Sequence, residues 1–165
     1  MKELKKYAPL ISAALGLIAL IMLFLPAIVA GEDVIKGTQA VFGWTEEVNV
    51  LVGVKKVEML EFSFMNLLTY VLVIAGIALA VLAFLQKKEL FAFIAAGCFA
   101  VAAVFFFCAI GFTVVAEGWN ELAALVNGDI KAEWKLGAGA VIGGICSILA
   151  VAAAVAPVVL KKLGK

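Results

Sequence analysis

The sequence contains no arginine and no histidine, and charged residues make up only 15% of its 165 residues. Arginine is the side chain best suited to phosphate groups. Histidine is the usual proton carrier near neutral pH and the commonest metal ligand. Together with a net charge of only +1, these absences argue against nucleic-acid binding. We therefore expect no nucleic-acid partner, no metal site and no cofactor.

Cysteine is also scarce, and its placement excludes a redox role. Cys98, Cys108 and Cys146 all fall within apolar runs, and no Cys-x-x-Cys pair exists. A thiol–disulfide relay of the thioredoxin kind is therefore not expected. We interpret the three thiols as small apolar packing groups.

Long apolar runs fill most of the chain. Hydrophobic residues make up 66% of the sequence and the mean hydropathy is +1.19, whereas a soluble domain has roughly 45–50% apolar residues. Helices over 8–30, 66–86, 90–115 and 136–160 would each cross a bilayer. The first run exceeds the apolar core of about 7–15 residues in a cleavable signal, so we expect a membrane anchor. Pro26 should kink or end that helix.

These patterns predict one domain, 1–165, with the fold class of an all-α membrane protein. Its core is a four-transmembrane-helix bundle, and a small antiparallel β-sheet lies in the first extracellular loop. The orientation follows from lysine counting. The termini and the 87–89 connection carry eight lysines and two acids, whereas loops 31–65 and 116–135 carry five lysines and ten acids. We therefore expect a plasma-membrane protein with cytoplasmic N- and C-termini and both longer loops outside.

The predicted helices carry small residues at a spacing of four. The clearest example is Gly139, Gly143 and Ser147 in the fourth span, and such stripes let helix backbones approach closely. The stripe either packs inside one four-helix bundle or faces outward and joins copies of the chain. In the second span, Asn66, Thr69 and Tyr70 share a helix face. They form either a girdle at the membrane interface or a small polar pocket under the first outer loop.

The first outer loop alternates apolar and polar residues, which indicates strands. Segment 34–44 is rich in β-forming residues, alternation follows over 48–55 and 60–64, and turn signals lie at 45–47 and 53–56. We expect two or three antiparallel strands that lead directly into the second span. A bare hairpin is marginal in water, so a short helix over 118–126 is the predicted cover. The predicted interaction surface comprises Phe42, Trp44, Phe62 and Trp119.

Two resemblances follow from these residues. Four spans, internal termini and a β-rich first outer loop resemble the architecture of claudins and peripheral myelin proteins. Phe42-Gly43-Trp44 is similar to the Gly-Leu-Trp part of the claudin signature, but the two cysteines that follow it in claudins are absent. The phrases at 36–43 and 61–70 are similar to small uncharacterised four-span proteins of low-GC bacteria. That second resemblance implies a family without implying an activity.

Three functions are open. The first is a non-enzymatic structural or protein-interaction module that acts through the β-rich loop on itself or on another membrane protein. The second is a small transporter or channel, or an accessory subunit of one, although the predicted spans lack the ionisable groups that coupled transport uses. The third is an enzyme at the outer leaflet with Glu58, Glu61 or Glu117 as acid or base. The third is the least favoured, because these glutamates have the pattern of solvated loop charges.

Overall fold

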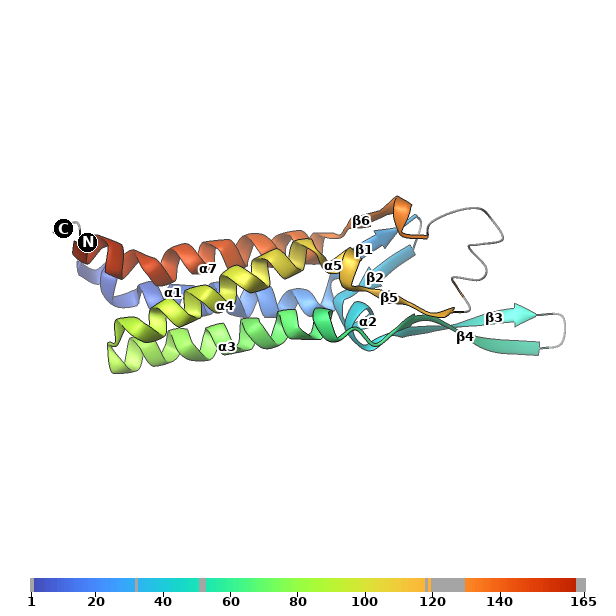
Figure 1. The fold of residues 1–165 in the computed structure, drawn as a ribbon, viewed down its shortest axis with the longest axis horizontal. Coiled ribbons are helices and arrows are strands. Elements are labelled where there is room, and N and C mark those ends of the chain that lie inside the picture. Colours follow the sequence, from blue (N-terminus) through green and yellow to red (C-terminus); the bar gives the residue numbers. More distant parts are fainter. Residues whose placement is uncertain (1, 32, 51–52, 118, 120–129, 163–165) are drawn as a thin grey trace.

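Four long helices form the body of the protein. The computed structural model describes residues 2–31, 33–50, 53–117, 119 and 130–162. The helices are α1 (Lys2–Ile21), α3 (Phe64–Gln86), α4 (Glu89–Phe107) and α7 (Ala138–Lys162), and all four are long and apolar enough to cross a membrane (Figure 1). Successive helices run in opposite directions, and each contacts two neighbours in the ring order α1–α3–α4–α7.

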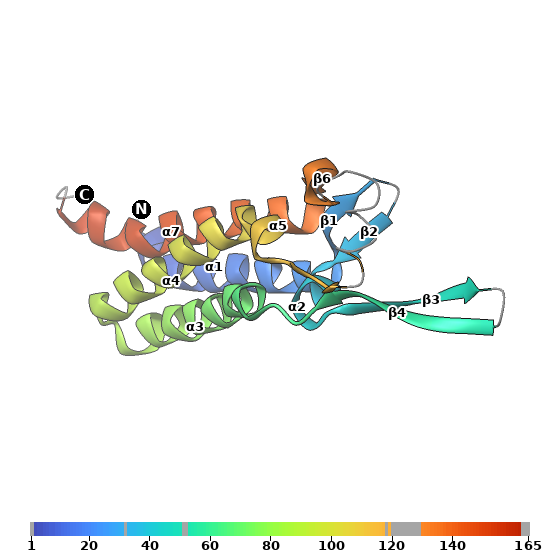
Figure 2. The ribbon, with the colours of Figure 1, turned by 45° about the vertical axis from the view of Figure 1, so that its right-hand side comes forward.

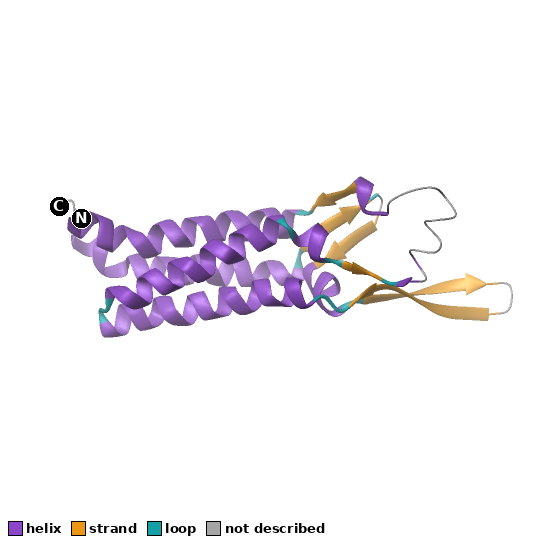
Figure 3. Cartoon of the chain, in the orientation of Figure 1, coloured by secondary structure: helices purple, strands orange, loops and turns teal. Residues whose placement is uncertain are grey.

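The two ends of the bundle differ in structure. The labelled chain termini and the short α3–α4 connection lie at one end, which we call the terminal end, and the strands that the structure describes lie at the other, which we call the sheet end (Figures 1 and 3). The predicted four-helix bundle is therefore confirmed as an architecture, whereas the one small sheet predicted in the first outer loop is replaced by two sheets that also take strands from 114–115 and 134–136.

Small residues fill the inside of the bundle. Phe99 of α4 is fully buried between Gly16 of α1 and Gly76 of α3. A Cβ added to Gly16 would lie 2.7 Å from the Phe99 ring, and a Cβ added to Gly76 would lie 2.9 Å from it. In the same way, a Cβ on Gly143 of α7 would lie 2.7 Å from the ring of Phe106. The exposed positions of the helices instead carry large apolar side chains, among them Leu17, Ile18, Ile74, Phe93, Val104 and Ile148. Such a wide apolar exterior suits lipid and not water.

The glycine and serine stripe of α7 faces the bundle interior. Gly139, Gly143 and Ser147 are all buried, and a Cβ on Gly139 would lie 2.8 Å from the carbonyl oxygen of Pro26. The Ser147 hydroxyl donates to the Gly143 carbonyl at 2.8 Å. The stripe thus lets α7 approach the end of α1 and the side of α4, and it is not available to a second copy of the chain.

The strands form two three-stranded antiparallel sheets. One sheet has the order β2–β1–β6 and the other has the order β3–β4–β5. Their bounds are Pro26–Ala30 (β1), Asp33–Lys36 (β2), Trp44–Val50 (β3), Gly53–Glu61 (β4), Val114–Val115 (β5) and Trp134–Leu136 (β6).

Each sheet extends one pair of helices. Strand β1 follows α1 and the turn η1 (Met22–Phe24), while β6, preceded by the turn η2 (Ile130–Glu133), leads into α7. The pairing of β1 with β6 therefore ties α1 to α7. Strand β4 leads into α3, and β5 follows α4 through the short helix α5 (Ala109–Phe112), so the β4–β5 pair ties α3 to α4. Figure 2 shows the two sheets standing over different halves of the bundle.

The structure corrects three helix ends. The helix predicted over 8–30 begins at Lys2 and stops at Ile21, and Pro26–Ala30 form a strand that pairs on both sides. The residue before a proline is driven out of the helical conformation, and Leu25 is extended with ψ 166°. The helix predicted over 90–115 ends at Phe107, after which the chain forms α5 and β5. The other two helices begin and end within two residues of the prediction.

The structure also corrects the first outer loop. The described part of 31–65 holds three strands, β2, β3 and β4, which agrees with the predicted two or three, but the short helix α2 (Gly37–Phe42) replaces most of the predicted extended segment 34–44. Gln39 stabilises the start of α2, because its side-chain oxygen accepts from the Lys36 amide at 2.8 Å. The predicted turn at 45–47 is wrong, since these residues pair with β4, and the predicted turn at 53–56 lies inside β4. The helix predicted over 118–126 lies outside the described residues except for Trp119.

Candidate binding pocket at the sheet end

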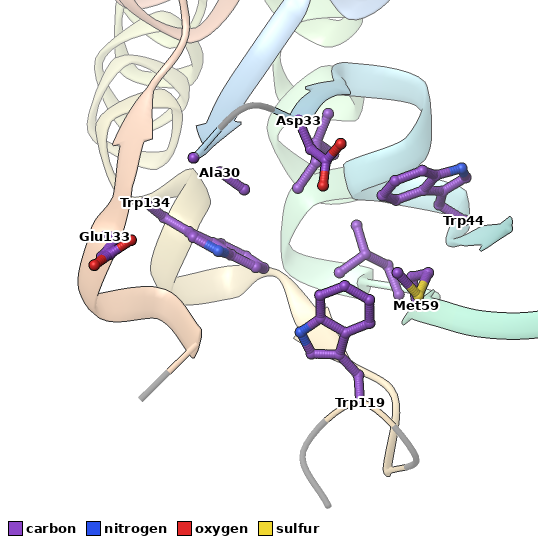
Figure 4. A pocket seen from close by; sticks show the side chains of 10 residues that line it. Ala30, Asp33, Trp44, Met59, Trp119, Glu133 and Trp134 are labelled. Atoms are coloured by element: carbon purple, nitrogen blue, oxygen red, sulfur yellow. The ribbon is translucent and has the colours of Figure 1, made fainter. Parts of the chain in front are cut away.

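A cavity of about 170 Å³ lies between the two sheets. Both sheets contribute to its walls, as does the segment that follows β5. The lining residues are Ala30, Gly31, Asp33, Ile35, Trp44, Met59, Leu60, Trp119, Glu133 and Trp134 (Figure 4). Below the pocket, an apolar cluster of buried residues joins the sheets to the helix ends; its members are Ala27, Ile28, Ile35, Ala40, Met59 and Leu60.

All three tryptophans of the chain line this pocket. Trp44 begins β3 opposite Leu60, directly after Gly43 turns the backbone at φ +89°. Trp134 begins β6 opposite Ala30 of β1. Trp119 is held beside β4 by two backbone bonds, because its amide donates to Ala116 at 3.1 Å and the Ala116 amide donates to Met59 at 3.2 Å. Each indole therefore comes from a different part of the chain and is fixed by backbone pairing.

Two carboxylates complete the lining. Asp33 on β2 and Glu133 at the end of η2 are both exposed. Within the described part of the chain, neither forms an ion pair, since the described ion pair joins Lys56 to Glu47 at 3.4 Å on the β3–β4 hairpin. The pocket thus combines aromatic faces with negative charge at its edge.

The structure divides the predicted interaction surface into two parts. Trp44 and Trp119 lie together in the pocket, whereas Phe42 and Phe62 do not line it and are 63% and 52% exposed. Phe42 ends α2, and Phe62 lies two residues before α3 begins. The two phenylalanines therefore belong to the junction between sheets and helices, where aromatic side chains often meet the headgroup layer of a membrane. Sequence reasoning did not include Trp134, since nothing in the sequence pairs β6 with β1.

The predicted polar group of α3 is buried, and the side chains of Asn66 and Thr69 form hydrogen bonds within the chain. The side-chain nitrogen of Asn66, Nδ2, donates to the Ala40 carbonyl at 3.0 Å and to the Thr113 hydroxyl at 3.1 Å. The Thr69 hydroxyl donates to its own helix at Met65, 3.1 Å away. Tyr70 packs edge-on against a phenylalanine of α4 with ring centres 5.4 Å apart. The cavity beside these side chains measures about 10 Å³, which is room for about one water molecule.

Asn66 is best described as a clamp between elements. It joins α3 to α2 through Ala40 and to the end of α5 through Thr113. Ser63 reinforces the same junction. Its hydroxyl caps α3 by accepting from the backbone N–H of Asn66 at 3.3 Å, and it donates to the Phe112 carbonyl at 2.6 Å. These bonds position the sheet holding Trp44 on top of the helices.

Other possible sites offer less chemistry. In residues 2–31, 33–50, 53–117, 119 and 130–162, no group of three or more histidine, cysteine or acidic side chains could hold a metal ion. Cys98, Cys108 and Cys146 are free thiols. A second cavity, of about 530 Å³, opens between the helices at the terminal end; it is mostly apolar, and Lys6, Lys87 and Lys88 are among its lining residues.

Comparison of the chain with protein-family models, with curated proteins and with solved structures found no match.

Proposed function

We propose that this chain is a non-enzymatic integral membrane protein that binds a partner protein through its sheet end. The four helices anchor it in the plasma membrane with both termini in the cytoplasm, and the sheet end faces outward. The lysine distribution supports this orientation, because positively charged connections are retained on the cytoplasmic side. The claudin-like combination of four spans with a β-rich first loop agrees with the same interpretation.

The observation that carries the proposal is the tryptophan-lined pocket between the sheets. Tryptophan is enriched among the residues that dominate binding energy at protein interfaces. Trp44, Trp119 and Trp134 are all half-buried, so each indole is fixed by packing and still presents part of its surface. Side chains held in place before binding lose little freedom on association. A rigid, partly open aromatic pocket on a membrane anchor therefore favours recognition over a purely structural role.

The helix bundle gives less support to the alternative, a small transporter or channel. The buried polar side chains hydrogen-bond within the chain; for example, the Ser12 hydroxyl donates to the Ala150 carbonyl at 2.8 Å across α1 and α7. In the described residues, no buried side-chain nitrogen or oxygen lacks a hydrogen-bond partner. Transport normally needs polar groups that are free to bind a solute or a proton inside the spans.

The test is crosslinking in native membranes with two matched variants. Trp44→Ser removes one wall of the pocket, and Phe42→Ser removes an aromatic ring that is more exposed but lies outside the pocket. Partners recovered with the tagged wild-type chain should be lost with Trp44→Ser and retained with Phe42→Ser. Equal recovery with all three chains, at equal amounts in the membrane, would rule out the pocket as the binding surface.

A further inference from the structure

The pocket between the sheets has the chemistry of a cation site. Indole rings carry negative charge on their faces and attract ammonium groups, an effect that is strongest for tryptophan. Trp44, Trp119 and Trp134 surround one cavity, and Asp33 and Glu133 are also among its lining residues. Figure 4 shows the Asp33 carboxylate on the Trp44 side of the cavity and Glu133 at the edge, beyond Trp134. We infer that this pocket binds an organic ammonium group, held against the indole rings and attracted by the negative charge of the two carboxylates at the edge. This inference specifies the ligand chemistry of the proposed binding surface and rests on that function.

The size of the cavity suits one such group. A cavity of about 150 Å³ in another protein holds one benzene molecule, which has six heavy atoms. The present cavity of about 170 Å³ is slightly larger. The end of a lysine side chain and a trimethylated ammonium group each have about the same number of heavy atoms. Either group therefore fits.

The ammonium groups of three nearby lysines are directed away from the pocket. Lys36 and Lys135 each follow, along a strand, a residue that lines the pocket, Ile35 and Trp134 respectively. Successive side chains of a strand point to opposite faces, so both ammonium groups point away. The Lys131 ammonium group donates to the Thr113 carbonyl at 2.6 Å, at the end of the helices.

The charge of the whole sheet end favours the same ligand. The sequence between α1 and α3 and between α4 and α7 contains ten acidic residues and five lysines. A surface with this excess of negative charge raises the local concentration of cations and their rate of association. For the partner protein proposed above, the matching group is a lysine side chain. A free quaternary amine presents the same chemistry, and the experiment separates the two sources.

The experiment uses the full-length protein in detergent at constant ionic strength. Because all three tryptophans line the pocket, intrinsic tryptophan emission reports directly on binding, and calorimetry provides a second readout. The ligands are Nα-acetyl-lysine methylamide, whose side-chain ammonium group is free, choline, and 3,3-dimethylbutan-1-ol, which has the shape of choline without its charge. We expect saturable binding of the lysine derivative, with the uncharged alcohol at least about tenfold weaker.

Variants connect the binding to the named residues. Asp33→Asn and Glu133→Gln change exposed side chains, so both proteins should fold, and each should weaken binding about three- to fivefold. Glu46→Gln is the matched control, because Glu46 is exposed on β3 and does not line the pocket. Trp44→Leu should weaken binding by about tenfold.

The outcomes separate this inference from the proposed function. Absence of saturable binding by both cations, or equal binding of the uncharged alcohol, overturns ammonium recognition. Binding of choline without the lysine derivative retains ammonium recognition and overturns its assignment to a partner's lysine. Loss of crosslinked partners with Trp44→Ser, together with no ammonium binding, retains the proposed function and overturns this inference.

Discussion

The junction between sheets and helices depends on Asn66, and replacing it with leucine tests this dependence. Asn66→Leu keeps roughly the same side-chain volume and removes the amide that donates to Ala40 and Thr113 at 3.0 Å and 3.1 Å. Each bond contributes about 1 kcal/mol to stability, so the loss should be about 2 kcal/mol. For a chain of this size, that corresponds to a decrease of about 4–8 °C in the midpoint of thermal unfolding.

Two signals locate the damage. The three tryptophans lie at the sheet end, so tryptophan emission should report the early loss of that end. Circular dichroism reports mainly the four long helices, and the side-chain bonds of Asn66 reach α2 and the end of α5 and not another long helix, so the midpoint of this signal should move less. Thr69→Val is the matched control, because Thr69 is equally buried but its hydroxyl bonds only within α3. An unchanged emission midpoint in Asn66→Leu, or an equal shift in Thr69→Val, would refute the clamp.

Three further predictions follow from close approaches and from topology. Gly143→Ala should destabilise the bundle by about 1–3 kcal/mol in a denaturation assay, because the added Cβ has no room beside the buried ring of Phe106. Gly97→Ala is the control, and because Gly97 has open space around it, this change should be neutral or slightly stabilising. Gly43→Ala should cost more stability than Gly31→Ala; both glycines have positive φ, but only Gly43 has a backbone carbonyl 2.7 Å from the added Cβ. A cysteine at Glu47, in a background without native cysteines, should react with an impermeant maleimide added to intact cells; labelling only after lysis would reverse the proposed orientation.

The helix bundle could be predicted from the sequence because apolar runs of this length have one stable arrangement in lipid. The residues at which the helices end could not be predicted in this way. Ala27 to Ala30 are as apolar as the helix before them, and only their pairing with β2 and β6 makes them a strand. Hydropathy alone does not distinguish a helix from a buried strand.

The pocket could be predicted only in part. Trp44 and Trp119 were expected at one surface because of their place in the outer loops, and the structure brings them together. Trp134 joins them through the pairing of β6 with β1, two segments about a hundred residues apart, which no local pattern encodes. Phe42 and Phe62 were grouped with the tryptophans because they are aromatic, and their exposed positions at the helix ends separate them from the pocket.

The central claim is that partner binding occurs in the pocket between the sheets. The most direct measurement places a photoreactive phenylalanine derivative at two adjacent positions of β4 in native membranes. Val57 is half-buried and packs against the apolar cluster beneath the pocket, whereas Glu58 is exposed on the opposite face of the strand. We expect a crosslinked partner from position 57 and little or none from position 58. Equal yields from both positions, or a product from position 58 alone, would contradict it.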